Sequence, residues 1–277
     1  MPSTSSHPQR TSRRTKEPKH PPPAPLGSAL LVASRDANLT EMRRLIRLGA
    51  PVEARDTRRN LWFTPLSWAA YGGIPAACEM LLDAGASHAI DAAGRTPLAL
   101  ASWSGHLECA KLLASSEQAR LCDDQGWTPL MRAAAGGRSS CARLLAPISD
   151  LAAANINGWR AIAIAAAYGQ TEALAVLLAQ ALPADVEAID SQGWTPLMRA
   201  AGNGQRQAAL ALINAGANPL PWGPAGPSAP AAARASGWGA LAAELQSLID
   251  AKRESKVLAA HLNQPPTEPD HTHHGWL

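Results

Sequence analysis

A nine-residue pattern recurs along the chain at a nearly constant spacing. The string Gly-Trp-Thr-Pro-Leu-Met-Arg-Ala-Ala occupies residues 126–134 and again residues 193–201. Related strings occupy residues 62–70, 94–102 and 158–166, and two weaker copies begin at Ser28 and Ser228. Aligned on the Thr position, the copies begin at residues 28, 64, 96, 128, 160, 195 and 228. Because self-similarity at a period of about 20 to 50 residues is the signature of stacked repeats, the chain is predicted to be a solenoid.

The residues of each copy predict a pair of short helices. Thr is a good N-cap, and Pro at the first helical position loses nothing because its missing N–H would have no helical partner. The Ala pair that follows makes a slim helix, and a Gly nine residues after the Thr position supplies the positive φ that closes it. A second apolar helix comes next. It is followed by a polar segment with an Asp or Asn three residues before a Gly, which is typical of a turn.

The period and the Thr-Pro-Leu opening of these units resemble the ankyrin-repeat family over about residues 27–250. The resemblance implies an all-α solenoid of about seven helix-turn-helix units with short hairpin loops. The sequence departs from the family after Thr-Pro-Leu, where His is usual. That position holds Ser67, Ala99, Met131, Ala163 and Met198. Without this polar side chain, stability is expected to depend more on apolar stacking.

The two ends of the chain differ from the repeats in composition. Residues 1–26 are rich in Pro, Ser, Thr and basic residues, and are predicted to form a disordered tail because they hold too little apolar surface to fold. Residues 27–250 are the predicted repeat domain. Residues 251–277 are expected to hold the end of a capping helix and a disordered tail with His271, His273 and His274. No metal site is predicted there, since a disordered His-rich tail is the simpler interpretation of these histidines.

The four cysteines have neither disulfide nor zinc-site spacing. Cys78, Cys109 and Cys141 fall in one column of the second helices, where the other units place apolar residues. They are therefore predicted to be core residues, which fits a reducing compartment. Cys122 falls in a hairpin beside Asp123 and Asp124, whose charges disfavour a thiolate, so an inert thiol is expected.

Charge and hydropathy exclude several classes of protein. The formal net charge is +3, and residues 1–27 alone hold five basic residues against one Glu, so the repeats are close to neutral. We therefore expect no nucleic-acid partner. The sequence has no apolar run of membrane-spanning length and no secretory h-region, so no membrane partner is expected. The expected localisation is cytoplasmic, with secretion into a host cell without a cleaved signal peptide as the alternative.

The residue before each Thr position is the main candidate for contact with a partner. In ankyrin-like folds the hairpins and first helices form a concave binding surface, and this column lies in the hairpin, outside the packing pattern. It holds three Trp residues in register, and Trp is enriched at interface hot spots. Further candidates lie in the first helices or near their ends. The predicted partner-binding residues are Phe63, Trp68, Tyr71, Arg95, Trp103, Trp127, Arg132, Trp159, Tyr168, Trp194 and Arg199.

The Trp column also has a structural interpretation. Successive Trp side chains in neighbouring hairpins would stack along the solenoid and substitute for the missing His network, and both interpretations can hold at once. Arg interleaved with Trp favours a partner that offers carboxylates or a helix of mixed chemistry. Two segments are longer than their counterparts in the other units: Ala54–Phe63, which holds arginines 55, 58 and 59, and Gln180–Ile189. Each is either part of the binding face or neutral loop variation.

The function that these features favour is a protein-interaction module, which would act as an adaptor, inhibitor or scaffold. The first alternative is a translocated bacterial effector that uses the repeats to bind a host protein. The second is an enzyme with an unrecognised site, but the sequence has no Gly-rich phosphate loop, no His-Glu-x-x-His and no Gly-x-Ser-x-Gly. No enzymatic activity and no cofactor are therefore expected. The partner is another protein, and the chain is expected to be a monomer or weak dimer.

Overall fold

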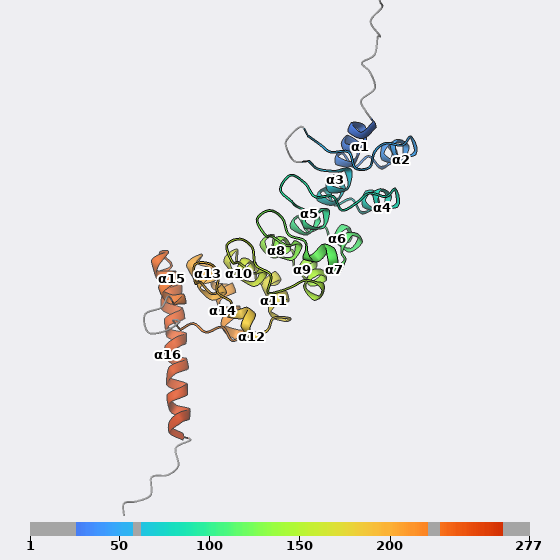
Figure 1. Cartoon of the computed structure of the whole chain (residues 1–277). Coiled ribbons are helices and arrows are strands. Elements are labelled where there is room, and N and C mark those ends of the chain that lie inside the picture. The colour runs from blue at the N-terminus through green and yellow to red at the C-terminus, as the bar shows by residue number, and fades with distance from the viewer. Residues whose placement is uncertain (1–25, 58–61, 221–227, 263–277) are drawn as a thin grey trace, which may run out of the picture.

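The computed structural model describes residues 26–57, 62–220 and 228–262, and gives no side-chain detail for residue 252 or residues 255–262. The chain forms an elongated stack of helix pairs (Figure 1). Three sequence-based expectations lie outside the described residues. These are the tail over residues 1–25, the arginines at 58 and 59, and the His-containing end over residues 263–277.

The helix pairs follow one another in chain order. The first helices are α1 (Leu26–Arg35), α3 (Pro65–Gly72), α5 (Pro97–Ser104), α8 (Pro129–Ala135), α10 (Ala161–Ala167), α13 (Pro196–Gly202) and α15 (Ala229–Ala235). The second helices are α2 (Leu39–Arg47), α4 (Pro75–Asp83), α6 (Leu107–Leu113), α9 (Ser139–Leu145), α11 (Thr171–Leu178), α14 (Arg206–Asn214) and α16 (Gly239–Leu262). Short helices α7 (Ser116–Arg120), η1 (Ala146–Ile148) and α12 (Pro183–Val186) lie between pairs.

Each helix packs on its counterpart in the next unit. First helices contact first helices from α1 to α15, and second helices contact second helices from α2 to α14. The first helices and hairpins therefore lie along one side of the stack, and the second helices lie along the other (Figure 1). The described residues form no strand, and only an isolated bridge joins Asp56 to Phe63. The prediction of an all-α solenoid is confirmed.

Capping chemistry fixes where the first helices begin. The hydroxyl oxygen of the N-cap accepts a hydrogen bond from the backbone N–H three residues later at Thr64, Thr96, Thr128, Thr195 and Ser228. Such a cap satisfies one of the N–H groups that a helix leaves without a partner. Helix α10 begins after Arg160, which makes no such bond. The Arg160 guanidinium instead pairs with Asp185 of α12 at 2.9 Å, so the inserted segment is tied to the unit whose cap is missing.

The core is a continuous column of small and medium apolar side chains. Cys78, Cys109 and Cys141 are buried within it, as predicted. A hydrogen bond to Cys109 and burial raise the pKa of the Cys78 thiol, and burial raises the pKa of the Cys141 thiol, so both thiols are neutral at physiological pH. The five residues that replace the family's usual His are also buried, at 4% exposure or less; Met131 belongs to this apolar cluster, and the Ser67 hydroxyl is hydrogen-bonded to that of Thr64.

A side chain from each unit packs over the Gly that closes the preceding first helix. Gly204 has φ +71, and the Trp238 ring lies so close that a Cβ on Gly204 would be 2.6 Å from Cδ2. Trp238 also donates from Nε1 to the carbonyl oxygen of Gly202 at 3.2 Å. The corresponding pairs are Gly73 with His106, Gly105 with Arg138, Gly137 with Gln170 and Gly169 with Gln205. Gly at this position therefore has two roles: it adopts the positive φ that ends the helix, and its lack of a Cβ leaves room for the side chain of the next unit.

The hairpins are also joined to one another. In each, one side-chain oxygen of Asp91, Asp123, Asn155 or Asp190 accepts hydrogen bonds from the backbone N–H groups two and four residues later. Neighbouring hairpin tips are linked by backbone hydrogen bonds of 3.1 Å. These bonds run from Asp124 to Ala93, from Ile156 to Gln125 and from Ser191 to Asn157. The predicted turn chemistry is confirmed, and the hairpins form a rigid frame for the side chains that follow.

Within the described part of the chain, no helix combines the length and apolar character that crossing a bilayer requires.

Candidate protein-binding surface

Arginines of the first helices lie against the tryptophans of the hairpins. The Arg132 guanidinium is 4.7 Å from the centroid of the Trp127 ring and 6.0 Å from that of Trp103. The Arg199 guanidinium lies between two rings, 4.7 Å from Trp159 and 4.8 Å from Trp194. A cation over the face of an indole ring is attracted by the ring quadrupole, and partial burial strengthens this attraction. Arg199 therefore joins the hairpins of two successive units.

The same arginines are paired with buried carboxylates at the base of the hairpins. Arg199 donates from Nε to Oδ2 of Asp190 at 2.6 Å, and Arg132 pairs with Oδ2 of Asp123. The side chains of Asp190 and Asp123 are 1% and 2% exposed. Each carboxylate thus satisfies its hairpin with one oxygen and its arginine with the other. The positive charges of this surface are neutralised within the protein.

The unit that begins at residue 160 lacks both members of this pair. Asn155 replaces the Asp, and Ile164 occupies the position of the Arg. The Asn155 Oδ1 still accepts both hairpin N–H groups, at 3.0 Å, but its buried Nδ2 has no hydrogen-bond partner among the described residues. Because an unpaired buried carboxylate is costly, the joint replacement of Asp and Arg keeps this unit free of an isolated charge.

The unit that begins at residue 64 has an aromatic cluster between its hairpin and its first helix, α3. Phe63 lies 4.8 Å from Trp68 and 6.1 Å from Tyr71 between ring centroids, with edge-to-face geometry. The Arg95 guanidinium lies 5.7 Å from the Phe63 ring and pairs with Asp91 at 2.7 Å. Phe63 is only 4% exposed. The expectation that the residue before the Thr position lies outside the packing is therefore wrong for Phe63, which fills the space between the hairpin and α3.

The remaining members of the column are partly buried. Trp127 and Trp159 pack against the core, and Trp194 packs over Gly202, where an added Cβ would come within 2.9 Å of the ring. These contacts support a structural role for the tryptophans. The predicted direct stacking of successive Trp rings is not seen among the described residues, where the Arg199 guanidinium contacts both Trp159 and Trp194 instead. A direct role of Trp127, Trp159, Trp194, Arg132 or Arg199 in binding remains a prediction.

Other predicted residues are open to solvent. Tyr71, Trp103 and Tyr168 are 46%, 45% and 54% exposed, and lie at the ends of α3, α5 and α10 on the side of the first helices. We call these three residues the exposed aromatic row. Trp68 is half-buried, and its indole Nε1 is buried without a hydrogen-bond partner among the described residues.

Sequence reasoning missed Trp62, which is 49% exposed beside Arg55 of the first insertion. The Arg55 guanidinium lies 5.9 Å from the Trp62 ring and donates to the carbonyl oxygen of Ile90 at 2.9 Å. This arrangement ties the insertion to the next hairpin. The length of the insertion and its arginines indicate this segment in the sequence, but Trp62 itself belongs to the repeat string and carries no separate signal.

Over the described ranges, no group of three or more His, Cys, Asp or Glu side chains is arranged to hold a metal ion. The surface instead presents aromatic rings on a hydrogen-bonded frame, which suits contact with another macromolecule.

Helix pairs, joined hairpins and glycine-closed first helices define a helical repeat solenoid. The family model of ankyrin repeats, which describes three copies, matches overlapping segments at residues 29–122, 88–153, 115–188 and 148–220. The chain therefore belongs to the ankyrin-repeat family, and the resemblance stated from the sequence is confirmed.

One solved structure with the same architecture is the crystal structure of the human ASB11 ankyrin repeat domain. It is similar with a TM-score of 0.66 and 25% identity, and the alignment covers 78% of this chain and 96% of that chain. A search of curated proteins finds no match to the sequence. Ankyrin repeats indicate a protein-interaction module, and proteins of this family are typically non-catalytic.

Proposed function

We propose that the chain binds a partner protein through the side formed by its hairpins and first helices, with the exposed aromatic row at the centre of the contact. The observation that carries this proposal is the exposure of Tyr71, Trp103 and Tyr168 on one side of a rigid frame. Exposed aromatic rings bury large area at small entropic cost when a partner covers them.

The partner that suits this surface offers apolar side chains more than carboxylates. Arg95, Arg132 and Arg199 all pair with aspartates, so a partner carboxylate would have to compete with an internal one. Of the two partners that the sequence left open, one offering carboxylates and a helix of mixed chemistry, this pairing favours a helix that presents an apolar face. The role of such binding is that of an adaptor, inhibitor or scaffold in the cytoplasm.

The test separates contact residues from framework residues. One variant carries Tyr71→Ala, Trp103→Ala and Tyr168→Ala, and a second carries Trp127→Ala, Trp159→Ala and Trp194→Ala. Partners identified by proximity labelling in cells would be purified, and their affinity for both variants and the parent measured at a temperature where all are folded. The proposal expects the first variant to lose affinity by at least about 30-fold, since even one hot-spot truncation costs about 2 kcal/mol or more.

An unchanged affinity of the first variant for every purified partner would contradict the proposal. A matched control is Leu112→Ala on α6, which removes an exposed apolar side chain from the opposite side of the stack. This variant is expected to bind as the parent does.

A further inference from the structure

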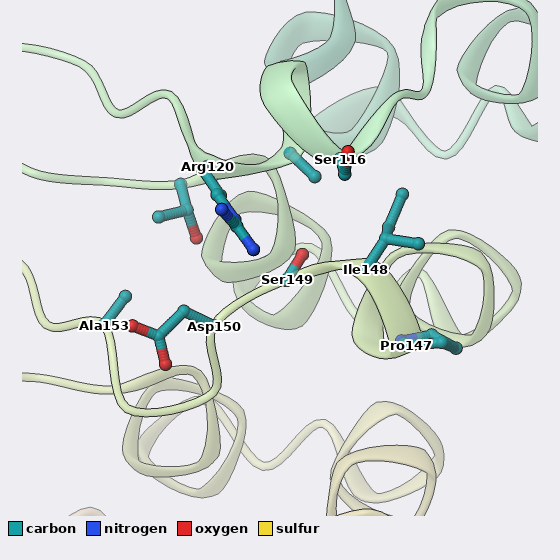
Figure 2. Close-up of a pocket in the computed structure, with 9 residues that line it drawn as sticks. Ser116, Arg120, Pro147, Ile148, Ser149, Asp150 and Ala153 are labelled. Atoms are coloured by element: carbon teal, nitrogen blue, oxygen red, sulfur yellow. The ribbon is translucent and has the colours of Figure 1, made fainter.

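The connections between units are not equivalent along the chain. Helices α2, α4 and α14 are followed by Gly49, Gly85 and Gly216, each with positive φ. The units that begin at residues 96 and 128 lack this Gly and instead form α7 and η1. A cleft of about 710 Å³ lies between these two connections. It is lined by Ser116, Ala119, Arg120, Thr128, Pro147, Ile148, Ser149, Asp150 and Ala153, as Figure 2 shows.

Arg120 is the one cationic side chain in this lining. It makes no hydrogen bond or ion pair with any described residue, whereas the arginines of the hairpin side are paired. Its guanidinium extends from α7 into the cleft in the direction of Ser149 (Figure 2). An unpaired guanidinium presents a planar fork of donors that matches a carboxylate.

The side chain of Ser149 adds a second unsatisfied group. Its Oγ is buried and has no hydrogen-bond partner among the described residues. A buried hydroxyl without a partner costs free energy, which a bound polar group would recover. Because Ser149 faces the same space as Arg120, a ligand held by Arg120 would lie beside Ser149 (Figure 2).

Asp150 limits the chemistry of the ligand. Its Oδ1 accepts the backbone N–H of Ala152 at 2.9 Å, and its carboxylate is directed away from Arg120 (Figure 2). The fixed negative charge of Asp150 disfavours a polyanionic ligand. The second carboxylate oxygen of Asp150 can still accept hydrogen bonds from the N–H groups of a ligand. The apolar side chains of Ala119, Pro147 and Ile148 complete the walls.

We propose that this cleft is a second binding site, which takes a peptide segment that carries a carboxylate. Arg120 holds the carboxylate, while Ser149 and Asp150 pair with the polar groups of the adjoining peptide. The volume lies within the range of about 300 to 1,000 Å³ that ligand sites occupy. The lining residues come from α7, η1 and the connection that follows η1, with Thr128 at the start of α8, and none of them belongs to the exposed aromatic row. The two sites would allow one chain to join two partners.

The experiment is a titration of the full chain, labelled with ¹⁵N, with three short peptides followed by amide chemical shifts. The first is acetyl-Ala-Glu-Ala-amide, whose only carboxylate is a side chain, and the second is acetyl-Ala-Ala-Ala with a free C-terminal carboxylate. The third is acetyl-Ala-Gln-Ala-amide, which has none. We expect saturable shifts in residues 116–120 and 148–153 with the first or second peptide at a Kd of about 1 mM, and none with the third. Which of the two binds identifies the source of the carboxylate.

Two variants make the titration specific. Arg120→Gln removes the cation from an exposed side chain and is expected to weaken binding at least about tenfold, as loss of a charge-assisted hydrogen bond does. Arg143→Gln removes an exposed arginine of α9 that does not line the cleft, and is expected to bind as the parent does. Both variants must give the dispersed spectrum of the parent. Shifts that persist in Arg120→Gln, equal shifts with the Gln peptide, or no shifts with either carboxylate peptide at about 10 mM would each overturn the proposal.

Discussion

Arg199 Nε lies 2.6 Å from Asp190 Oδ2, and this pair joins the start of a hairpin to the helix that follows it. The same guanidinium separates the rings of Trp159 and Trp194. A single side chain therefore connects the turn of one unit, the helix of that unit and the hairpin of the preceding unit. This relationship explains how a stack without the family's usual His keeps its hairpins in register.

Replacing Arg199 alone is expected to destabilise the chain strongly. Arg199→Ile leaves the Asp190 carboxylate buried without its cation, which costs about 3 kcal/mol in the free energy of unfolding. The double variant Arg199→Ile with Asp190→Asn reproduces the Ile164 and Asn155 of the neighbouring unit, and is expected to recover about half of that loss. Urea denaturation of both variants measures the difference. A double variant no more stable than the single one would show that the charge pair is not what matters.

The contact between Gly204 and Trp238 predicts a second difference in stability. Gly204→Ala forces both a positive φ on Ala and a clash with a rigid ring, while Gly216→Ala forces only the positive φ, because nothing lies within 4 Å of its Cβ position. The first substitution is expected to cost at least about 1 kcal/mol more than the second, beyond the penalty of about 1 to 2 kcal/mol that both share. Combining Gly204→Ala with Trp238→Ala should remove the excess. Equal costs for the two glycines would rule out this packing role.

The Thr caps predict a smaller and more local effect. Thr195→Ala removes the acceptor for the N–H of Met198 and is expected to lower the free energy of unfolding by about 1 kcal/mol. Thr195→Ser keeps the hydroxyl and serves as the control, with an expected loss below about 0.5 kcal/mol. Amide hydrogen exchange at the start of α13 reports the same change locally. Identical behaviour of the Ala and Ser variants would mean that the methyl group, and not the cap, stabilises this position.

His88 gives the stability of the chain a pH dependence of known sign. Burial lowers the pKa of His88 below its ordinary value of 6.5, and its Nδ1 has no hydrogen-bond partner among the described residues. Between the folded and unfolded pKa values, His88 is therefore protonated in the unfolded chain and neutral in the folded chain. This contribution is fully present above pH 6.5 and is lost as the pH falls through 6.5 towards the folded pKa. His88→Asn is expected to flatten the dependence between pH 5 and pH 7 relative to the parent, when stability is measured by urea denaturation. If the free energy of unfolding of His88→Asn changes with pH as steeply as that of the parent, other groups cause the pH dependence.

Much of the fold follows from short-range chemistry, which is why it is readable in the sequence. Thr at the cap, Pro at the first helical position and Gly at the helix end each act within one turn, so the starts and ends of α3, α5, α8 and α13 could be predicted. The burial of Cys78, Cys109 and Cys141 followed from their common column. Period and register are sufficient for such conclusions because each unit meets only its neighbours.

The details of the site depend on contacts that the repeat pattern does not specify. The sequence predicts Arg199 as a candidate contact residue, but its pairing with Asp190 requires the hairpin to fold back over α13. Phe63 was expected in the open hairpin and is buried, because Trp68 and Tyr71 close over it. The cleft beside α7 arises from two irregular connections in adjacent units, and neither connection alone predicts it.

The most direct test of the account is the free energy of unfolding of the chain that carries Trp127→Ala, Trp159→Ala and Trp194→Ala. If these rings join the hairpins through Arg132 and Arg199, the loss of three partly buried aromatic side chains and their cation–π contacts should lower it by more than about 3 kcal/mol. The corresponding loss for Tyr71→Ala, Trp103→Ala and Tyr168→Ala should be smaller, because about half of each of these side chains is exposed. A Trp variant as stable as the parent would contradict the framework role of the tryptophans and return them to the list of free contact residues.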